Sequence, residues 1–256
     1  MIRNFITALQ FLTIFTVKKN HTVEEGDLAK SMVYFPVIGF LIGVLLVYAD
    51  KVLELIALPQ TIATFLVVIL SVLITRALHV DGLADTLDGL MGGRDHQSRL
   101  AIMKDSRIGT AGVVGILCSL FMKYLCLNNL FAIDRVGALL IAPMLGRWSQ
   151  TFMVYQANYG REEGMGRAFV GHLRSGSMLA VFLIAVCLSA FVVLRLDLRS
   201  VFLFFSLLIG VLLLTSLGKR YLVHKLGGVT GDAIGAISEL NEVLVFLIFI
   251  VFSSES

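Results

Sequence analysis

The side chains best suited to chemistry lie in residues 79–112, HVDGLADTLDGLMGGRDHQSRLAIMKDSRIGTAG. Asp81, Asp85 and Asp88 have the spacing i, i+4 and i+7, so in a helix they would share one face. Carboxylates this close repel one another unless a cation lies between them, and Mg²⁺ takes oxygen ligands together with waters or phosphate oxygens. A solvated polar loop between membrane helices is the alternative, but it does not explain helical spacing amid glycines. The pattern therefore predicts a divalent cation on this face.

Basic residues follow the aspartates in IMKDSRIGTAG, residues 102–112. Lys104 and Arg107 come shortly before two glycines at the expected start of a membrane helix, where backbone N–H groups favour a phosphate. Anchoring of the chain by positive charges explains the two cations but not Asp105 between them. We therefore expect an anion near this helix start.

Two further polar segments could contribute to the same site. In YGREEGMGRAF, charges alternate with glycines, and a flexible surface loop is an equally good interpretation; the charged residues are Arg161, Glu162, Glu163 and Arg167. In LGGVTGDAIGAISEL, Asp232 and Glu239 are seven residues apart and share a helical face. Carboxylates inside a membrane are costly and tend to be functional, although Asp232 could also cap its helix.

Two more ionisable residues need an explanation. His79 adjoins the acidic segment and could act as a base, donate to a phosphate or make a structural hydrogen bond. Arg147 lies within an apolar segment and requires a counter-charge, for which Asp232, Glu239 or a bound phosphate would serve.

Composition indicates the elements that must position these groups. Hydrophobic residues make up 57% of the 256 residues, whereas a soluble domain has about 45–50%. We therefore expect an all-α, polytopic membrane bundle with residues 1–256 as one domain, about six to seven spans and an additional short N-terminal apolar helix. The expected spans are 32–49, 56–75, 108–127, 130–155, 177–194, 200–217 and 232–252.

Lysine and arginine alternate in step with these spans, which predicts the orientation of the chain. The basic connections are the region before residue 32 and the segments 76–107, 156–176 and 218–231, and all of them are expected on the cytoplasmic side. The acidic segment and both glycine-rich loops would then face the cytosol together. The net charge of +3 is small, and no nucleic acid partner is expected.

Carboxylates with a divalent cation and basic groups indicate phosphoryl or phosphodiester transfer at the membrane face. A cation-coupled transporter also uses carboxylates in a helical bundle, but it would place them near the midplane. A polyprenyl-diphosphate transferase uses two aspartate-rich helices, and here the second would consist of Asp232 and Glu239 alone.

Five segments resemble the cobalamin synthase family, the adenosylcobinamide-GDP ribazoletransferases. They are YFPVIGFLIG, HVDGLADTLDGL, IMKDSRIGTAG, YGREEGMG and GGVTGDAIGAISEL, in the order of the family. Val80 and Gly160 depart from the family pattern without changing a charged group. The acidic motif is also similar to the signature of the CDP-alcohol phosphotransferases, but it lacks their full spacing and their Ala-Arg pair, so that family is the second candidate.

The resemblance implies a multi-pass, Mg²⁺-dependent transferase of the cell inner membrane. It would join adenosylcobinamide-GDP to α-ribazole or its 5′-phosphate, giving adenosylcobalamin or its 5′-phosphate and GMP, late in cobalamin biosynthesis. A homo-oligomer is compatible with this interpretation.

The site residues are assigned on the same basis. Asp81, Asp85 and Asp88 would hold the metal, and Asp88 or Asp105 would be the catalytic base. The expected substrate-binding residues are His79, Lys104, Arg107, Arg147, Arg161, Glu163, Asp232 and Glu239.

Overall fold

The fold consists of packed helices. The structure is a computed structural model that describes residues 2–18, 26–161, 164–170, 173–195 and 200–253. No β-strand occurs in these ranges, which confirms the all-α prediction. The helices are α1 Ile2–Leu12, α2 Asp27–Ser31, the 3-10 helix η1 Met32–Tyr34, α3 Phe35–Leu55, α4 Gln60–Ile74, α5 Leu78–Gly92, α6 His96–Ile102, α7 Thr110–Asn129, α8 Ala132–Val154, the 3-10 helix η2 Met165–Ala168, α9 Ser175–Val193, α10 Ser200–Leu226 and α11 Gly231–Phe252.

Five helical segments of the described chain are long and apolar enough to cross a membrane, and α4 with α5 forms a sixth candidate that is bent by 84°. The five are the segment from α2 through α3, and helices α7, α9, α10 and α11. Two of the predicted spans are not among these five helical segments. Helix α4 has only 15 residues, and α8 carries charged residues among its 23. The N-terminal α1, with 11 residues, is the expected short apolar helix and is too short to span.

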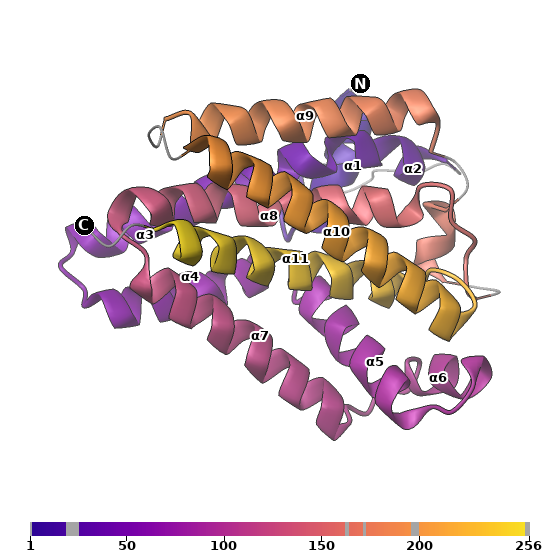
Figure 1. The fold of residues 1–256 in the computed structure, drawn as a ribbon. Helices are drawn as coiled ribbons and strands as arrows, with labels where there is room; N and C mark the ends of the chain where they lie inside the picture. Colours follow the sequence, from indigo (N-terminus) through magenta and orange to yellow (C-terminus); the bar gives the residue numbers. More distant parts are fainter. Residues whose placement is uncertain (1, 19–25, 162–163, 171–172, 196–199, 254–256) are drawn as a thin grey trace.

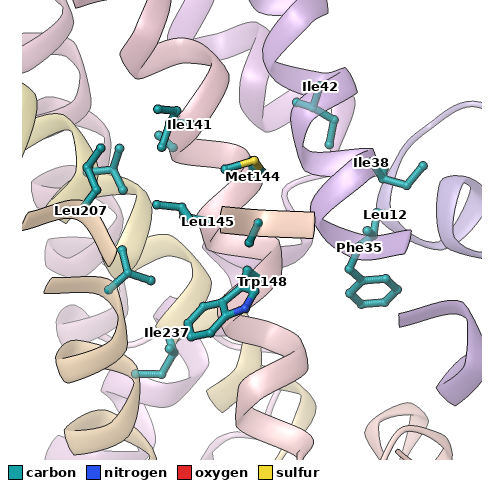
Figure 2. Close-up of a cluster of buried hydrophobic side chains, with 14 of the residues drawn as sticks. Leu12, Phe35, Ile38, Ile42, Ile141, Met144, Leu145, Trp148, Leu207 and Ile237 are labelled. Atoms are coloured by element: carbon teal, nitrogen blue, oxygen red, sulfur yellow. The ribbon is translucent and has the colours of Figure 1, made fainter. Parts of the chain in front are cut away.

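Helix α8 forms the centre of the bundle and packs against α3, α9, α10 and α11 (Figure 1). Its side chains Ile141, Met144 and Leu145 are completely buried, and they face α3 and α10 in the close-up of Figure 2. The pair Gly39 and Gly43 lets α3 approach α8 closely, because a Cβ on either glycine would collide with the α8 backbone. The two glycines form a GxxxG pattern, in which small residues let two membrane helices approach closely.

A sharp corner separates α4 from α5. Arg76 and Ala77 have positive φ values of 53° and 58°, and this turns the chain out of the direction of α4. Two hydrogen bonds tie the corner to the end of α1: Arg76 Nη2 donates to the Thr13 carbonyl at 2.8 Å, and the Ile14 amide donates to the Ile74 carbonyl at 2.8 Å. The corner brings α5, with its aspartates, alongside α11 (Figure 1).

The polar segments between the spans meet at one end of the bundle. Arg99 of α6 donates to the carbonyl of Lys225, in the last turn of α10, at 3.0 Å, so the acidic segment contacts the end of the helix that leads into the loop before α11. That loop also pairs with the loop after α8: the Gly160 amide donates to the Val229 carbonyl and the Val229 amide to the Asn158 carbonyl, both at 2.9 Å. The acidic segment and both glycine-rich loops therefore lie together, as their alternating basic character predicts.

Candidate active site

The candidate site forms where α5 and α11 touch, and glycines allow this contact. A Cβ at Gly82 would lie 2.8 Å from the Asp232 carbonyl oxygen, and a Cβ at Gly235 would lie 3.3 Å from the Cα of His79. Only glycine therefore permits the observed approach of the two backbones at Gly82. The expected helix over the aspartates exists as α5, and its close partner is α11.

Replacement of Gly82 by Ala is expected to separate α5 from α11, because the new methyl group would press on the α11 backbone at Asp232. Overpacking of this kind costs about 1–3 kcal/mol of stability, and the displaced aspartates should lower activity further. Thermal unfolding in detergent and turnover measure both effects. Gly176→Ala is the matched control, since a Cβ there meets nothing within 4 Å. Equal behaviour of the two variants would contradict this role of Gly82.

A cavity of about 220 Å³ opens beside this helix contact. One wall is polar, with His79 and Asp81 from α5, Asp232 from α11, and Tyr159 and Arg161 from the loop after α8. Another part of the lining, the aromatic wall, consists of three rings: those of Phe11 and Phe35 stack with centroids 6.1 Å apart, and the ring centroid of Phe169 lies 5.0 Å from that of Phe11. The cavity can thus bind a charged group and a flat apolar group at the same time.

Two carboxylates of α5 remain available at this site. Asp81 is exposed and lines the cavity, and Asp85, one turn further, is half-buried. Neither carboxylate accepts a hydrogen bond from, or forms an ion pair with, a residue in the part of the chain that the structure describes. Both lie within electrostatic range of Asp232, whose carboxylate pairs with Arg161 at 2.7 Å. The structure therefore brings Asp81, Asp85, Asp232 and Arg161 together.

This donor set suits a hard cation only in combination with other oxygens. Among the described residues, no three His, Cys, Asp or Glu side chains are grouped closely enough to hold a metal ion alone. Mg²⁺ is usually bound through one or two carboxylates, with waters and substrate phosphates completing its shell. Asp81 and Asp85 fit that pattern. The larger set of three aspartate ligands stays a prediction.

Asp88 has a different contact from the other two aspartates. Its Oδ2 accepts the Gly109 amide at 2.7 Å and its Oδ1 accepts the Gly112 amide at 2.8 Å, at the start of α7. A carboxylate at a helix N-terminus is stabilised by the unpaired amides and the helix dipole. Glycine is required there, because a Cβ at either position would collide with the carboxylate. The amides that we expected to bind a phosphate are thus occupied by Asp88, and its role as metal ligand or base stays a prediction.

Lys104, Asp105 and Arg107 are exposed and do not line the cavity. The Arg107 guanidinium donates to both oxygens of Asp105, at distances down to 2.6 Å. These hydrogen bonds lower the pKa of Asp105 to about 2. A carboxylate with so low a pKa is a weak proton acceptor at neutral pH. Its contact with Arg107 therefore disfavours Asp105 as the base, although the roles of these three residues stay predictions.

Arg147 has a buried counter-charge, but it is none of the expected ones. Its guanidinium pairs with Glu242 of α11 and also contacts His79 Nδ1 at 3.2 Å. Glu239 does not reach the cavity and instead accepts from Lys123 Nζ at 2.7 and 2.8 Å. The same Nζ donates to Glu242 at 2.7 Å. The prediction of Asp232 or Glu239 as partner of Arg147 was wrong, because the α8 face that carries Arg147 meets α11 at Glu242.

Some residues of the site escaped the sequence analysis. Lys123 is 3% exposed although it lies within an apolar span, and a lone lysine in such a helix was the available signal. Tyr159 lines the cavity, and burial raises the pKa of its phenol above the usual value, so the hydroxyl keeps its proton. The aromatic wall gave no sequence signal, because its rings come from three distant segments. Glu163 lies outside the described residues.

Comparisons with known proteins agree with the motifs. The model of the cobalamin-5-phosphate synthase family matches residues 4–250. A protein of Geotalea daltonii named adenosylcobinamide-GDP ribazoletransferase is 40% identical, with 96% of both chains covered. A protein of the same name from Clostridioides difficile is 33% identical, with 97% of this chain and 96% of the relative covered. Another from Alkaliphilus metalliredigens is 35% identical, with 96% of this chain and 95% of the relative covered. No solved structure matches. The resemblance is confirmed, and the chain belongs to the cobalamin-5-phosphate synthase family.

Proposed function

We propose that this protein is an adenosylcobinamide-GDP ribazoletransferase whose transfer site is the cavity between α5 and α11. The observation that carries the proposal is the meeting of Asp81, Asp232 and Arg161 at one cavity, with Asp85 within electrostatic range of both aspartates, in a member of this family. In the reaction, a hydroxyl oxygen of α-ribazole or its 5′-phosphate forms a bond to the phosphorus next to the cobinamide arm. The phosphoanhydride bond breaks, and GMP leaves with the electron pair.

The phosphates of the donor are placed at the start of α11. Gly231 and Asp232 of this helix line the cavity, so the positive end of the helix dipole faces it. Arg161 lies beside them and can hold a phosphate oxygen with the part of its guanidinium that Asp232 does not use. Arg161 is held in turn by its bond to Asp232, which limits its motion.

Asp81 and Asp85 are the residues that would hold Mg²⁺, together with waters and oxygens of the diphosphate. The ion supplies charge neutralisation on the diphosphate and on the leaving phosphate. Asp81 and Asp232 both line the cavity, but Asp232 pairs with Arg161, so the Asp81 carboxylate is the one that takes the proton of the attacking hydroxyl. This assignment follows from the engagement of Asp88 with α7 and of Asp105 with Arg107.

The acceptor is placed against the aromatic wall. Phe11, Phe35 and Phe169 offer ring surfaces for the planar base of a ribazole, and stacking also excludes water from the reacting atoms. A cavity of about 220 Å³ is below the usual range of roughly 300–1,000 Å³ for small-molecule sites. The large corrinoid of the donor therefore stays outside this cavity.

Purified protein in liposomes is expected to release GMP from adenosylcobinamide-GDP when α-ribazole and Mg²⁺ are supplied. A CDP-alcohol donor is the control, because a CDP-alcohol phosphotransferase would release CMP from it. An ion-flux assay on the same liposomes tests the transporter alternative. Release of CMP or ion flux, with no GMP formed, would contradict the proposed function.

We also infer that the site faces the cytoplasm, with the chain embedded in the cell inner membrane. The basic character of 76–107, 156–176 and 218–231 supports this orientation. In a chain whose own cysteines are replaced, a cysteine at His96 should resist an impermeant thiol reagent in intact cells. A cysteine at Ile56, in the connection between α3 and α4, should react, since Ile56 is 65% exposed. The opposite labelling pattern would show that the chain has the inverse orientation in the membrane.

A further inference from the structure

A buried row of charged side chains leads from the cavity into the bundle. It begins at His79 on α5, continues through Arg147 on α8 and Glu242 on α11, and ends at Lys123 on α7 with Glu239. Each of these side chains is at most 6% exposed, and His79 alone among them lines the cavity. Two cations face two carboxylates, so the row is electrically balanced without a charge on His79. Such a costly arrangement needs an explanation beyond packing.

Arg147 determines which nitrogen of His79 carries the proton. The Arg147 Nη2 lies 3.2 Å from His79 Nδ1. A guanidinium has donors only, so Nδ1 must accept this hydrogen bond and has no proton. A neutral imidazole has one donor and one acceptor, and its proton is therefore on Nε2. A proton on Nδ1 would set two donors against each other.

The Nε2 edge of His79 is left for the cavity. Nδ1 faces Arg147, and His79 contributes to the cavity wall, so the other side of the ring borders the open space. Nε2 has no hydrogen-bond partner within the ranges that the structure describes. Unlike Trp148 Nε1, which is fully buried without a partner, it is not one of the unpartnered atoms that the protein closes off completely. His79 is 4% exposed. A buried polar group that lacks a protein partner and borders a cavity can hydrogen-bond a water or a ligand atom in that cavity.

We propose that His79 donates an Nε2–H hydrogen bond to a phosphate oxygen of the donor substrate, and that Arg147 is the positioning residue that fixes this tautomer. The identity of the oxygen rests on the proposed function, since Arg161 and the start of α11 border the same cavity. Both nitrogens of His79 are then engaged, so the ring has no lone pair with which to take the hydroxyl proton. Glu242 and Lys123 act one step further away, because they hold Arg147 in place.

The tautomer can be measured without turnover, so that failure of this inference is distinguishable from failure of the proposed function. Protein labelled with ¹⁵N-histidine in lipid nanodiscs is examined by NMR, and the His79 signals are those missing from His79→Gln. The expected result is an unprotonated Nδ1 and a protonated Nε2. A proton on Nδ1 overturns the inference.

Addition of inorganic pyrophosphate with Mg²⁺ should shift the Nε2–H signal of His79. An unchanged signal at saturating pyrophosphate overturns the contact with phosphate.

A charge-balanced variant tests the positioning role of Arg147. Arg147→Met combined with Glu242→Gln removes the donor at Nδ1 but leaves the pair of Lys123 with Glu239. His79 should then populate both tautomers, and an unchanged single tautomer would contradict the role of Arg147. If this variant does not fold, the wild-type spectrum still decides the tautomer.

Kinetics separate a donor from a base. The side-chain amide of Gln reaches close to the place of Nε2, whereas Asn is shorter. Loss of one donor to a developing charge costs about 10²–10³-fold in turnover, so His79→Asn should lose at least about a hundredfold. His79→Gln should be at least about tenfold more active than His79→Asn. Equal losses in both folded variants would overturn the donor role.

Discussion

Replacement of Asp85 by Asn is expected to reduce GMP release by at least a few hundredfold. The change keeps the size and polarity of a side chain that has no hydrogen-bond partner in the described chain, but it removes the charge that Mg²⁺ requires. Loss of one such electrostatic contact costs about 3–4 kcal/mol of transition-state stabilisation. Turnover measured across a Mg²⁺ titration checks the prediction, and higher Mg²⁺ should restore part of the loss.

Asp95 provides the matched control for this substitution. It lies outside the helical register of the other aspartates, and its carboxylate caps α6 by accepting the Ser98 amide at 2.8 Å. Asparagine is an equally good cap, so Asp95→Asn should keep both stability and activity. Folding of Asp85→Asn should also persist, because the change removes repulsion from Asp81 and Asp232. Near-normal activity and metal dependence in Asp85→Asn would show that this face of α5 is an ordinary solvated surface and does not bind the metal.

Replacement of Lys123 by Met is expected to destabilise the bundle by about 3–5 kcal/mol, because it leaves Glu239 and Glu242 buried with only Arg147 to balance them. Thermal unfolding in detergent measures the loss. Adding Glu239→Gln to Lys123→Met restores the balance of charge and should recover much of the stability.

An exposed pair serves as the second control. Lys51 contacts Glu54 at 2.6 Å, but both side chains are largely in solvent, so Lys51→Met should cost less than about 1 kcal/mol. If Lys123→Met were as mild as Lys51→Met, the buried row would not be an interdependent set of charges.

The local features of the site could be predicted from sequence because they depend on spacing along one helix. The helical period put Asp81 and Asp85 on one face, and the structure has both of them on α5. Basic residues in alternate connections grouped the polar loops at one end, and the structure has them in contact. These inferences need only the geometry of a helix and the positive-inside rule.

The contacts between distant helices could not be predicted in this way. Asp88 shares the face of Asp81 and Asp85, yet it turns to the start of α7 because two amides there have no helical partner. The partner of Arg147 depends on the rotation of α8 against α11, which selects Glu242 over Glu239. Sequence spacing does not determine such rotations, since they follow from packing of all neighbours at once.

Binding of Mn²⁺, a spectroscopic substitute for Mg²⁺, tests the central claim most directly. Paramagnetic resonance on the purified protein with adenosylcobinamide-GDP reports bound Mn²⁺ without any turnover. The account predicts that Mn²⁺ binds to the wild-type protein and to Asp95→Asn, that Mg²⁺ displaces it, and that Asp81→Asn and Asp85→Asn bind it far more weakly. Mn²⁺ binding of undiminished affinity in both Asp81→Asn and Asp85→Asn would contradict a metal site on this face of α5.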